Sequence, residues 1–475
     1  MISEDFRALI LENFHHEPTQ EQNYVIGLWC DFLLSREDDS IFLLKGYAGT
    51  GKTSLVGALV KTLQILKQRV VLLAPTGRAA KVMGAYAQFP AGTIHKHIYR
   101  QKTFGDERFT AAPNLKTNTL YIVDEASMIA NDGLAGSVFG DGRILDDLIQ
   151  FVYSCQGCKL IIIGDTAQLP PIGEICSPAL ERTELEGYGM RVISAELTQV
   201  VRQLDSSGIL WNATTLRQCI ENYDAIPKIR ISFPDISVVS GEELIESLEQ
   251  SYWNCSKEGT IVITRSNKRA NIYNMGIRNR ILDYDCELGG GDMVMVAKNK
   301  YLNNKDLIAN GEMAEVMRIY NERELYGFRF ADASLKLLDR NNNQGEENKE
   351  EGVPTELNTV VLLDTLHSDA PALTKEQQQS LFTQVCEDYS EIKNKRDLMT
   401  AVKNDRHYGA LQIKYAYAIT CHKAQGGQWE DVYIDQGYIT EDMLNEDYIR
   451  WLYTAITRAT RHVYLVNWPE VQIEE

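Results

Sequence analysis

Long apolar runs are missing from this chain of 475 residues. No segment approaches the roughly 18 uninterrupted apolar residues of a membrane-spanning helix. The first residues, Met1-Ile2-Ser3-Glu4-Asp5, are acidic, whereas a secretory signal begins with a basic segment. Both absences predict a cytoplasmic protein with no membrane partner.

Paired cysteines are also scarce. The nine cysteines are scattered singly except for Cys155 and Cys158, which form an isolated C-x-x-C. A structural zinc site needs four ligands, and no second pair lies nearby. We therefore expect free thiols and no metal site at these cysteines.

An excess of basic charge is missing as well, since the formal net charge is −18. This value argues against a protein that coats nucleic acid through bulk basicity, but it leaves room for a local basic groove. The composition, 44% hydrophobic and 24% charged, is ordinary for a globular protein, and the length suits about three domains.

A glycine-bearing loop follows the apolar run Ile41–Leu44 and reads Gly-Tyr-Ala-Gly-Thr-Gly-Lys-Thr over residues 46–53. Glycines let backbone N–H groups approach phosphate closely, and leucines at helical spacing behind the loop predict a helix whose N-terminus faces the phosphates. Lys52 is expected to reach the β- and γ-phosphates and Thr53 to bind Mg²⁺. The loop residues expected to bind ATP are Gly46, Ala48, Gly49, Thr50, Gly51, Lys52, Thr53 and Ser54.

Short apolar strands alternate with helical stretches from about residue 20 to 200, which predicts an α/β fold around a parallel sheet. The expected strands are 41–44, 70–73, 120–123 and 160–163. Ligands bind outside the carboxyl ends of such strands, so their loops should converge on one site. A second α/β set runs from the strand at 260–263 to the strand at 463–466, interrupted over about 300–410 by a segment that contains the hydrophilic stretch 341–352.

Two of the converging loops carry chemistry that suits ATP hydrolysis. Asp124 is expected to hold Mg²⁺ through its water shell, and Glu125 to orient and deprotonate the attacking water. Gln168 has an amide that can bond both the γ-phosphate and that water. Taken alone, the acidic pair also fits a solvated turn, and the segment at Gln168 fits a proline turn after a strand.

Eight segments together resemble the motifs of superfamily 1 helicases, in that family's order. They are residues 46–53 (motif I), 74–81 (Ia), 93–95 (Ib), 124–127 (II), 164–171 (III), 197–203 (IV), 417–426 (V) and 453–459 (VI). The wording Ala-Pro-Thr-Gly-Arg-Ala-Ala-Lys together with His-Lys-Ala-Gln-Gly is similar to the RecD and phage Dda branch of superfamily 1B, whose members move 5′ to 3′. The chain departs from the family at Gly427, where Ser or Met is common, and over 300–410.

The resemblance implies two RecA-like domains. Domain 1A is expected over residues 1–200, with a hairpin 1B at about 97–117. Domain 2A is expected over 201–300 and 411–475, interrupted by a β-rich, SH3-like domain 2B over 301–410. The hairpin position resembles the pin of the Dda branch, so Phe104 or Phe109 is a candidate to stack on the terminal base pair; equally, both rings can close the hairpin's own core.

Further side chains take roles from the matched motifs. Arg202 and Arg458 resemble the family's two arginine fingers, which reach the phosphate only when the domains close. Gln22 resembles the glutamine that reads adenine, although glutamines also occur in ordinary helix starts. The candidates for contact with a single strand are Thr76, Arg78, His95, Thr420, His422 and Lys423. Thr420 and His422 also suit a connection between the ATP and DNA sites.

The resemblance therefore implies a monomeric, ATP- and Mg²⁺-dependent DNA helicase that translocates 5′ to 3′ on single-stranded DNA and unwinds duplex or forked DNA, with replication or repair proteins as partners. Two alternatives stand beside it. One is a translocase that displaces proteins or drives a repair complex without unwinding. The other is a scaffold that binds nucleotide without hydrolysing it, against which the full set of catalytic candidates argues.

Overall fold

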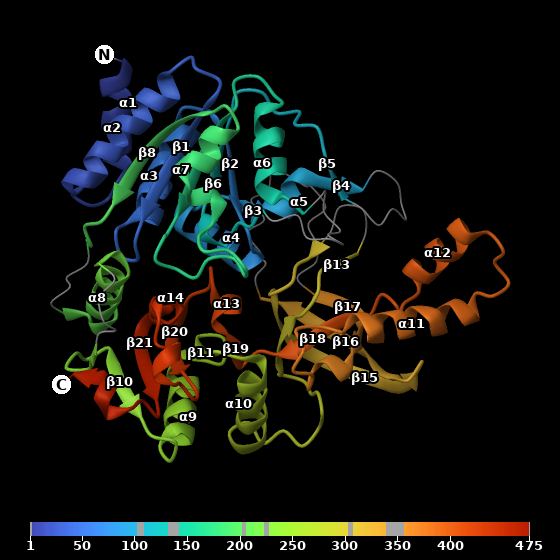
Figure 1. The fold of residues 1–475 in the computed structure, drawn as a ribbon. Helices are drawn as coiled ribbons and strands as arrows, with labels where there is room; N and C mark the ends of the chain where they lie inside the picture. Colours follow the sequence, from blue (N-terminus) through green and yellow to red (C-terminus); the bar gives the residue numbers. More distant parts are fainter. Residues whose placement is uncertain are drawn as a thin grey trace.

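The computed structural model describes residues 2–101, 109–131, 142–201, 206–222, 228–302, 307–338 and 356–474. They form two parallel sheets flanked by helices and a closed β-barrel beside the second sheet (Figure 1). Over these ranges no helix is long and apolar enough to cross a membrane. The predicted α/β class with a β-rich insertion is confirmed.

The first sheet has the strand order β3-β2-β6-β7-β1-β8, and its pairs are parallel. Strand β1, which lies between β7 and the edge strand β8, is buried on both faces: Phe42 and Leu44 pack into one core, and Ile41 and Leu43 into another. Such continuous apolar runs are typical of strands covered by helices on both sides. The strands are β1 (Ser40–Gly46), β2 (Arg69–Ala74), β3 (Ala91–Thr93), β6 (Thr119–Val123), β7 (Lys159–Gly164) and β8 (Arg191–Leu197).

Helices and one short hairpin surround this sheet. The helices are α1 (Ile2–Asn13), α2 (Gln20–Leu34), α3 (Lys52–Ile65), α4 (Gly77–Ala87), α5 (Ile94–Ile98), α6 (Ile144–Tyr153) and α7 (Arg182–Gly187), with short 3₁₀ turns η1 (Ala126–Met128) and η2 (Pro178–Leu180). The hairpin pairs β4 (Tyr99–Gln101) with β5 (Phe109–Ala111) in antiparallel register. Its expected Gly105-Asp106 turn lies outside the described residues.

The second sheet has the order β10-β21-β20-β11-β19 and is also parallel. Its strands are β10 (Ile236–Val239), β11 (Thr260–Thr264), β19 (Ala418–Thr420), β20 (Trp429–Asp435) and β21 (Ala459–Val466). The accompanying helices are α8 (Gly208–Asn222), α9 (Leu244–Cys255), α10 (Asn267–Arg280), α13 (Cys421–Ala424) and α14 (Glu446–Ile456), with η5 (Glu441–Met443), η6 (Glu470–Gln472) and the strand pair β9 (Ile229–Arg230) and β22 (Ile473–Glu474). In Figure 1, α13 and α14 lie on the side that faces the first sheet.

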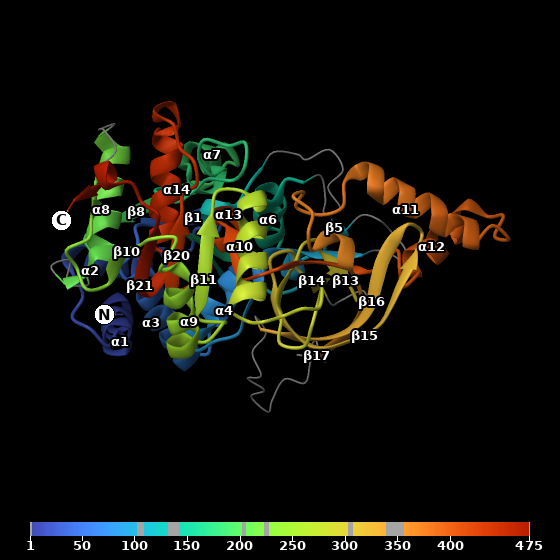
Figure 2. The same cartoon turned by 90° about the horizontal axis from the view of Figure 1, so that it is seen from below.

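The inserted segment forms a closed barrel in the order β12-β15-β16-β17-β18. Its strands are β12 (Met293–Val296), β15 (Met313–Leu325), β16 (Phe328–Leu337), β17 (Glu356–Leu362) and β18 (Leu411–Tyr415). A strand pair β13 (Lys300–Tyr301) and β14 (Leu307–Ile308), a turn η4 (Leu363–Thr365) and helices α11 (Lys375–Asp388) and α12 (Lys395–Asn404) accompany it. Figure 2 shows the barrel to one side of the two sheets, with α11 and α12 at its far end.

The barrel is fixed to the second sheet at its base. The Arg278 guanidinium of α10 makes two hydrogen bonds to Asp292, at 2.8 and 2.9 Å, and the Tyr417 hydroxyl donates a third at 2.9 Å. Arg278 and Asp292 are both buried. A buried charge without a partner is strongly destabilising, so this fully bonded pair holds the entry to the barrel in one geometry.

Candidate active site and nucleic-acid interface

The glycine loop lies where β1 ends and α3 begins. Gly49 and Gly51 have φ values of 78° and 82°, in the left-handed region that favours glycine. A Cβ at Gly51 would lie 2.6 Å from the Gln22 amide nitrogen, and one at Gly49 would lie 2.8 Å from Leu210 of the second domain. No side chain caps the N-terminus of α3. The loop therefore presents the first backbone N–H groups of that helix to any phosphate that enters.

Lys52 and Gln22 both contact the loop backbone. The Lys52 ammonium donates to the carbonyl of Tyr47 at 2.8 Å and also to that of Gly46. The Gln22 amide donates to the Thr50 carbonyl at 3.0 Å, while its oxygen accepts from the Thr19 backbone in a capping box at the start of α2. Lys52 thus lies within the loop, and Gln22 supports it from behind. The adenine-reading role of Gln22 stays a prediction.

The acidic pair follows β6 at the same edge of the sheet. Burial, together with the neighbouring Glu125 charge, raises the pKa of Asp124 to about 6. Its carboxylate accepts the Glu125 backbone N–H at 2.8 Å. Glu125 itself has a φ of 54°, which is rare for a residue with a side chain. Such strain, held by the surrounding structure, is typical of functional positions.

Gln168 carries an unpaired polar atom at the end of β7. The residue is 6% exposed, and its side-chain oxygen is buried without a hydrogen-bond partner among the described residues. A buried amide oxygen is costly to leave unbonded, so its position suits a hydrogen-bond donor supplied by a ligand or by water. This observation fits the expected contact of Gln168 with the attacking water.

Hydrogen bonds cross from the second domain to this edge of the first. The Tyr453 hydroxyl of α14 accepts the Ala48 backbone N–H of the glycine loop at 2.9 Å and donates to Asp165 at 2.7 Å. The Thr454 hydroxyl accepts the Leu169 N–H at 2.9 Å, and the Gln425 amide donates to the Leu169 carbonyl at 2.7 Å. Motifs I and III are therefore bonded directly to motifs V and VI.

Arg458 is buried at the end of α14. Its guanidinium donates to the carbonyl of Thr454 at 3.0 Å and to the hydroxyl of Thr457 at 3.1 Å, both in its own domain. Its role as an arginine finger stays a prediction. Arg202, the other expected finger, lies outside the described residues.

Motif Ia and motif V pack against each other across the cleft. The Arg78 guanidinium lies 3.8 Å from the centre of the Trp429 ring, a cation–π geometry. A Cβ at Gly427 would lie 2.6 Å from that ring and 2.8 Å from the Arg78 Nε, and one at Gly426 would lie 2.7 Å from Ala79. The glycine at 427, where the family often has Ser or Met, thus makes room for the Arg78–Trp429 contact.

The other DNA candidates lie on the elements that border the cleft. Thr76 caps α4 by accepting the Ala79 N–H at 3.2 Å. Burial lowers the pKa of His95 to about 4, so it is neutral at pH 7. The Lys423 ammonium is buried without a hydrogen-bond partner among the described residues, and burial lowers its pKa to about 8. Thr420 precedes α13, and His422 is exposed on it. Strand contact by these residues stays a prediction.

The proposed wedge residues are only partly covered by the structure. Phe104 lies outside the described residues. Phe109 begins β5, where its backbone pairs with Gln101. The antiparallel pairing of β4 and β5 agrees with the predicted hairpin. The wedge role of either ring stays a prediction.

The interdomain bonds identify functional candidates that the sequence did not single out. Tyr453, Thr454, Asp165 and Gln425 stand inside the recognised motifs, but a hydroxyl or amide within a motif does not reveal its partner. The signal available in the sequence was their presence beside Arg458 and Gln168. Their hydrogen-bond partners follow only from the three-dimensional arrangement of the two sheets.

Comparisons with known proteins agree with these motifs. The AAA domain family matches residues 33–219, and the UvrD-like helicase C-terminal domain family matches residues 415–466. The ATP-dependent RecD2 DNA helicase of Deinococcus radiodurans is 30% identical over 171 residues, which is 36% of this chain and 21% of that protein. The ATP-dependent DNA helicase Dda of phage T4 is 24% identical over 270 residues, 53% of this chain and 55% of Dda.

Among solved structures, a Pif1 helicase from Bacteroides in complex with ADP-AlF3 and single-stranded DNA is similar at 16% identity and a TM-score of 0.47, covering 97% of this chain and 95% of that one. The chain spans about a fifth of the RecD2 helicase and about half of Dda. The two family matches and these relatives make the chain similar, over the matched segments, to superfamily 1B helicases of the RecD- and Dda-like branch.

Proposed function

We propose that this protein is an ATP-dependent DNA helicase that translocates 5′ to 3′ on single-stranded DNA and separates duplex or forked DNA, acting as a monomer. The observation that carries the proposal is the Tyr453 hydroxyl of α14, which bonds across the cleft to both the glycine loop and Asp165 of the first domain. A movement of the phosphate loop therefore alters the hydrogen bond to α14. Through α14 it can also shift α13, the helix that carries His422 and Lys423. Such a connection is what turns hydrolysis into movement.

The residues of the first domain fit Mg²⁺ and ATP. The Thr53 hydroxyl and the Asp124 carboxylate are the oxygen donors that Mg²⁺ prefers. Mg²⁺ is commonly bound by one or two protein oxygens together with phosphate and water, which is the number of ligands that these two side chains offer. Bound Mg²⁺ and ATP would supply the γ-phosphate and the charge that polarises it.

Each catalytic candidate then has a task that its chemistry permits. Glu125 accepts a proton from the attacking water, which Gln168 orients through its unpaired amide oxygen. Lys52 moves from the loop carbonyls to the phosphate oxygens and stabilises their developing charge. Arg458 and Arg202 add planar cationic donors when the cleft closes.

A strand-displacement assay tests polarity and unwinding together. Duplexes with a 5′ or a 3′ single-stranded tail are incubated with protein and ATP·Mg²⁺, with the Glu125→Gln variant as the control that binds but does not hydrolyse. We expect separation of the 5′-tailed duplex only. DNA-stimulated hydrolysis without separation would instead indicate a translocase, and separation of the 3′-tailed duplex alone would reverse the assigned polarity.

A further inference from the structure

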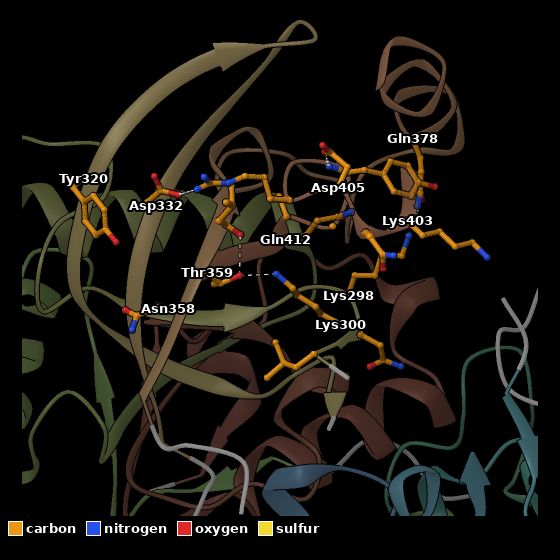
Figure 3. A pocket seen from close by; sticks show the side chains of 18 residues that line it. Lys298, Lys300, Tyr320, Asp332, Asn358, Thr359, Gln378, Lys403, Asp405 and Gln412 are labelled. Carbon is orange, nitrogen blue, oxygen red and sulfur yellow. Dashed lines mark hydrogen bonds and ion pairs between the residues drawn. The ribbon is translucent and has the colours of Figure 1, made fainter. Parts of the chain in front are cut away.

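A polar cavity of about 850 Å³ lies between the barrel and its two helices. Its walls come from the segment that joins β12 to β13, from β17 and β18, and from the turn that follows α12 (Figure 3). This size is typical of pockets that hold small molecules. All of its lining residues fall between the two family matches, so the helicase motifs do not account for it.

Two lysines enter the cavity and contact only neutral acceptors there. The Lys298 ammonium donates to the Gln378 side-chain oxygen at 2.8 Å, and the Lys300 ammonium donates to the Thr359 hydroxyl at 2.5 Å. Over the described part of the chain, neither lysine forms an ion pair with a carboxylate. Two lysines therefore line the same cavity, and neither is paired with a described carboxylate there.

The carboxylates that line the same cavity are already engaged. Asp332 forms ion pairs with Arg323 and Arg406. Asp405 accepts the backbone N–H groups of His407 and Tyr408, at 2.8 and 2.9 Å. Neither acid is available to compensate the two lysines.

The lysines are held at a cost in solvation. Burial lowers the pKa of Lys298, and it lowers the pKa of Lys300 to about 8. An anion bound at such an ammonium group would replace the lost hydration and favour its charged form.

The remaining walls offer groups that suit a nucleobase. Asn358 and Gln412 are amides with both donor and acceptor atoms, and the Tyr320 ring is 47% exposed. We propose that this cavity binds a nucleotide, with phosphate bound at Lys298 or Lys300 and its base beside Asn358 and Tyr320. The phosphate is either that of a free nucleotide or one within a nucleic-acid strand. In the second case the inference deepens the proposed function, because the strand is its substrate.

Chemical acylation of lysine provides the first test, in a Lys52→Ala background that removes the phosphate-loop site and all hydrolysis. At pH 8 about half of Lys300 is uncharged and nucleophilic, whereas an exposed lysine with a pKa of about 10.4 is less than about 1% uncharged. Acetylation is followed by mass spectrometry with no addition, with a 12-residue oligothymidylate, or with thymidine triphosphate. We expect Lys298 and Lys300 to be protected about fivefold, while Lys375 on the exposed side of α11 is unchanged.

The additions distinguish the sources of the phosphate. Protection by the oligothymidylate alone assigns the cavity to a strand, protection by the triphosphate alone assigns it to a free nucleotide, and protection by both assigns it to either form. Protection by neither overturns the proposal. Because the Lys52→Ala protein does not hydrolyse ATP, failure of the proposed helicase activity leaves this outcome unaffected.

Charge removal is the second test. The double variant Lys298→Gln/Lys300→Gln is compared with the matched control Lys375→Gln/Lys395→Gln, which removes two exposed charges from α11 and α12, the helices beside the cavity. By fluorescence anisotropy we expect about tenfold weaker binding of the protecting probe in the cavity variant and less than twofold change in the control. If the probe is the strand, the slope of log affinity against log salt should fall by about 1.4, for two lost phosphate contacts.

A thermal melting curve of each variant shows whether it is still folded when its binding is measured. Removal of two partly buried charges relieves a desolvation cost, so the cavity variant should melt no earlier than the native protein. Unchanged binding in a variant that is folded contradicts the proposal.

Discussion

Each sheet contains a unit in which a strand leads directly into a helix, and the two units differ in whether a side chain caps the N-terminus of that helix. In the first, β1 leads to α3, whose N-cap is Gly51 with a φ of 82° and no side-chain cap. In the second, β11 leads to α10, where the Ser266 hydroxyl accepts the Arg269 N–H at 3.2 Å. The second helix satisfies its own N-terminus, whereas the first leaves it to a ligand. The same fold unit is therefore a binding site in one domain and a structural element in the other.

The acidic side chains at the strand ends differ in the same sense. Asp435, at the end of β20, is buried and receives two hydrogen bonds from the Arg269 guanidinium. Asp124, at the end of β6, forms no ion pair with an arginine among the described residues, and burial raises its pKa to about 6. The acid of the first domain therefore has no described arginine partner, although the Lys52 charge acts on it, whereas the acid of the second domain is paired with Arg269. Destabilising groups of this kind cluster at functional sites.

The largest test of this comparison is the Lys52→Ala substitution. If the first unit is the catalytic one, loss of the ammonium that reaches the phosphates should lower DNA-stimulated ATP hydrolysis by about a thousandfold or more. Lys61→Ala, on the exposed side of the same helix, is the matched control and should hydrolyse ATP normally. Normal hydrolysis by the Lys52 variant would remove the distinction between the two units.

Substitution of Asp124 by Asn should show how much the burial of its charged carboxylate lowers the free energy of unfolding. The pKa of Asp124 is higher in the folded chain than the ordinary 3.8, so the folded state binds the proton more tightly and stability falls as pH rises from about 4 to 6. Without nucleotide, the variant should be more stable than the native protein at pH 8 by about 3 kcal/mol, and this gain should vanish below pH 4.

Denaturant unfolding across this pH range measures the difference, with Asp435→Asn as the contrasting variant. Asp435 is paired, so its replacement should destabilise the protein at pH 8. A gain at Asp124 that does not depend on pH would rule out the assigned cause.

The Tyr453→Phe substitution tests whether the second domain acts through the first. It leaves the Ala48 N–H and Asp165 without their shared hydroxyl but keeps the ring in place. We expect DNA-stimulated turnover to fall about tenfold, equivalent to about 1.4 kcal/mol, and basal turnover to fall less. Tyr448→Phe, on the same helix but bonded to Gln436, serves as the control. Equal loss of both rates would make Tyr453 part of the nucleotide site alone.

The smallest expected effect belongs to the capped helix of the second unit. Ser266→Ala removes the hydroxyl that caps α10 and should cost about 1 kcal/mol of stability. The rate of ATP hydrolysis should be retained below the melting temperature, because no phosphate is expected at this helix. A loss of hydrolysis in the folded variant would mean that the second unit also contributes to the nucleotide site.

The features that depend on short stretches of sequence were predicted correctly. The strand positions 41–44, 120–123 and 160–163, the glycine loop and the antiparallel pairing at Tyr99 follow from short-range hydrophobic and turn patterns, and the structure has each of them. Contacts between distant segments did not follow. The Arg78–Trp429 stacking needs two domains in register, and no spacing within a motif encodes it.

The inserted region shows the same limit. Its β-rich character was expected from the family resemblance over 301–410, but barrel closure depends on the pairing of β12 with β18, which are more than a hundred residues apart in the chain. The sequence likewise gave no indication that Lys298 and Lys300 line a cavity. Lys298 and Lys300 are ordinary residues until folding brings Gln378 and Thr359 to them.

That pairing at the barrel base has a consequence for engineering. Val294 faces Tyr415, and Val296 faces Ile413, so the chain enters and leaves the barrel on neighbouring strands. Neighbouring strands are about 4.8 Å apart, a gap that a short turn spans. The two ends of the insert thus lie side by side, although residues of the barrel and of the second sheet share one hydrophobic core. A two- to five-residue link could join these ends, but removal of the barrel would also expose that core and leave buried Arg278 without Asp292.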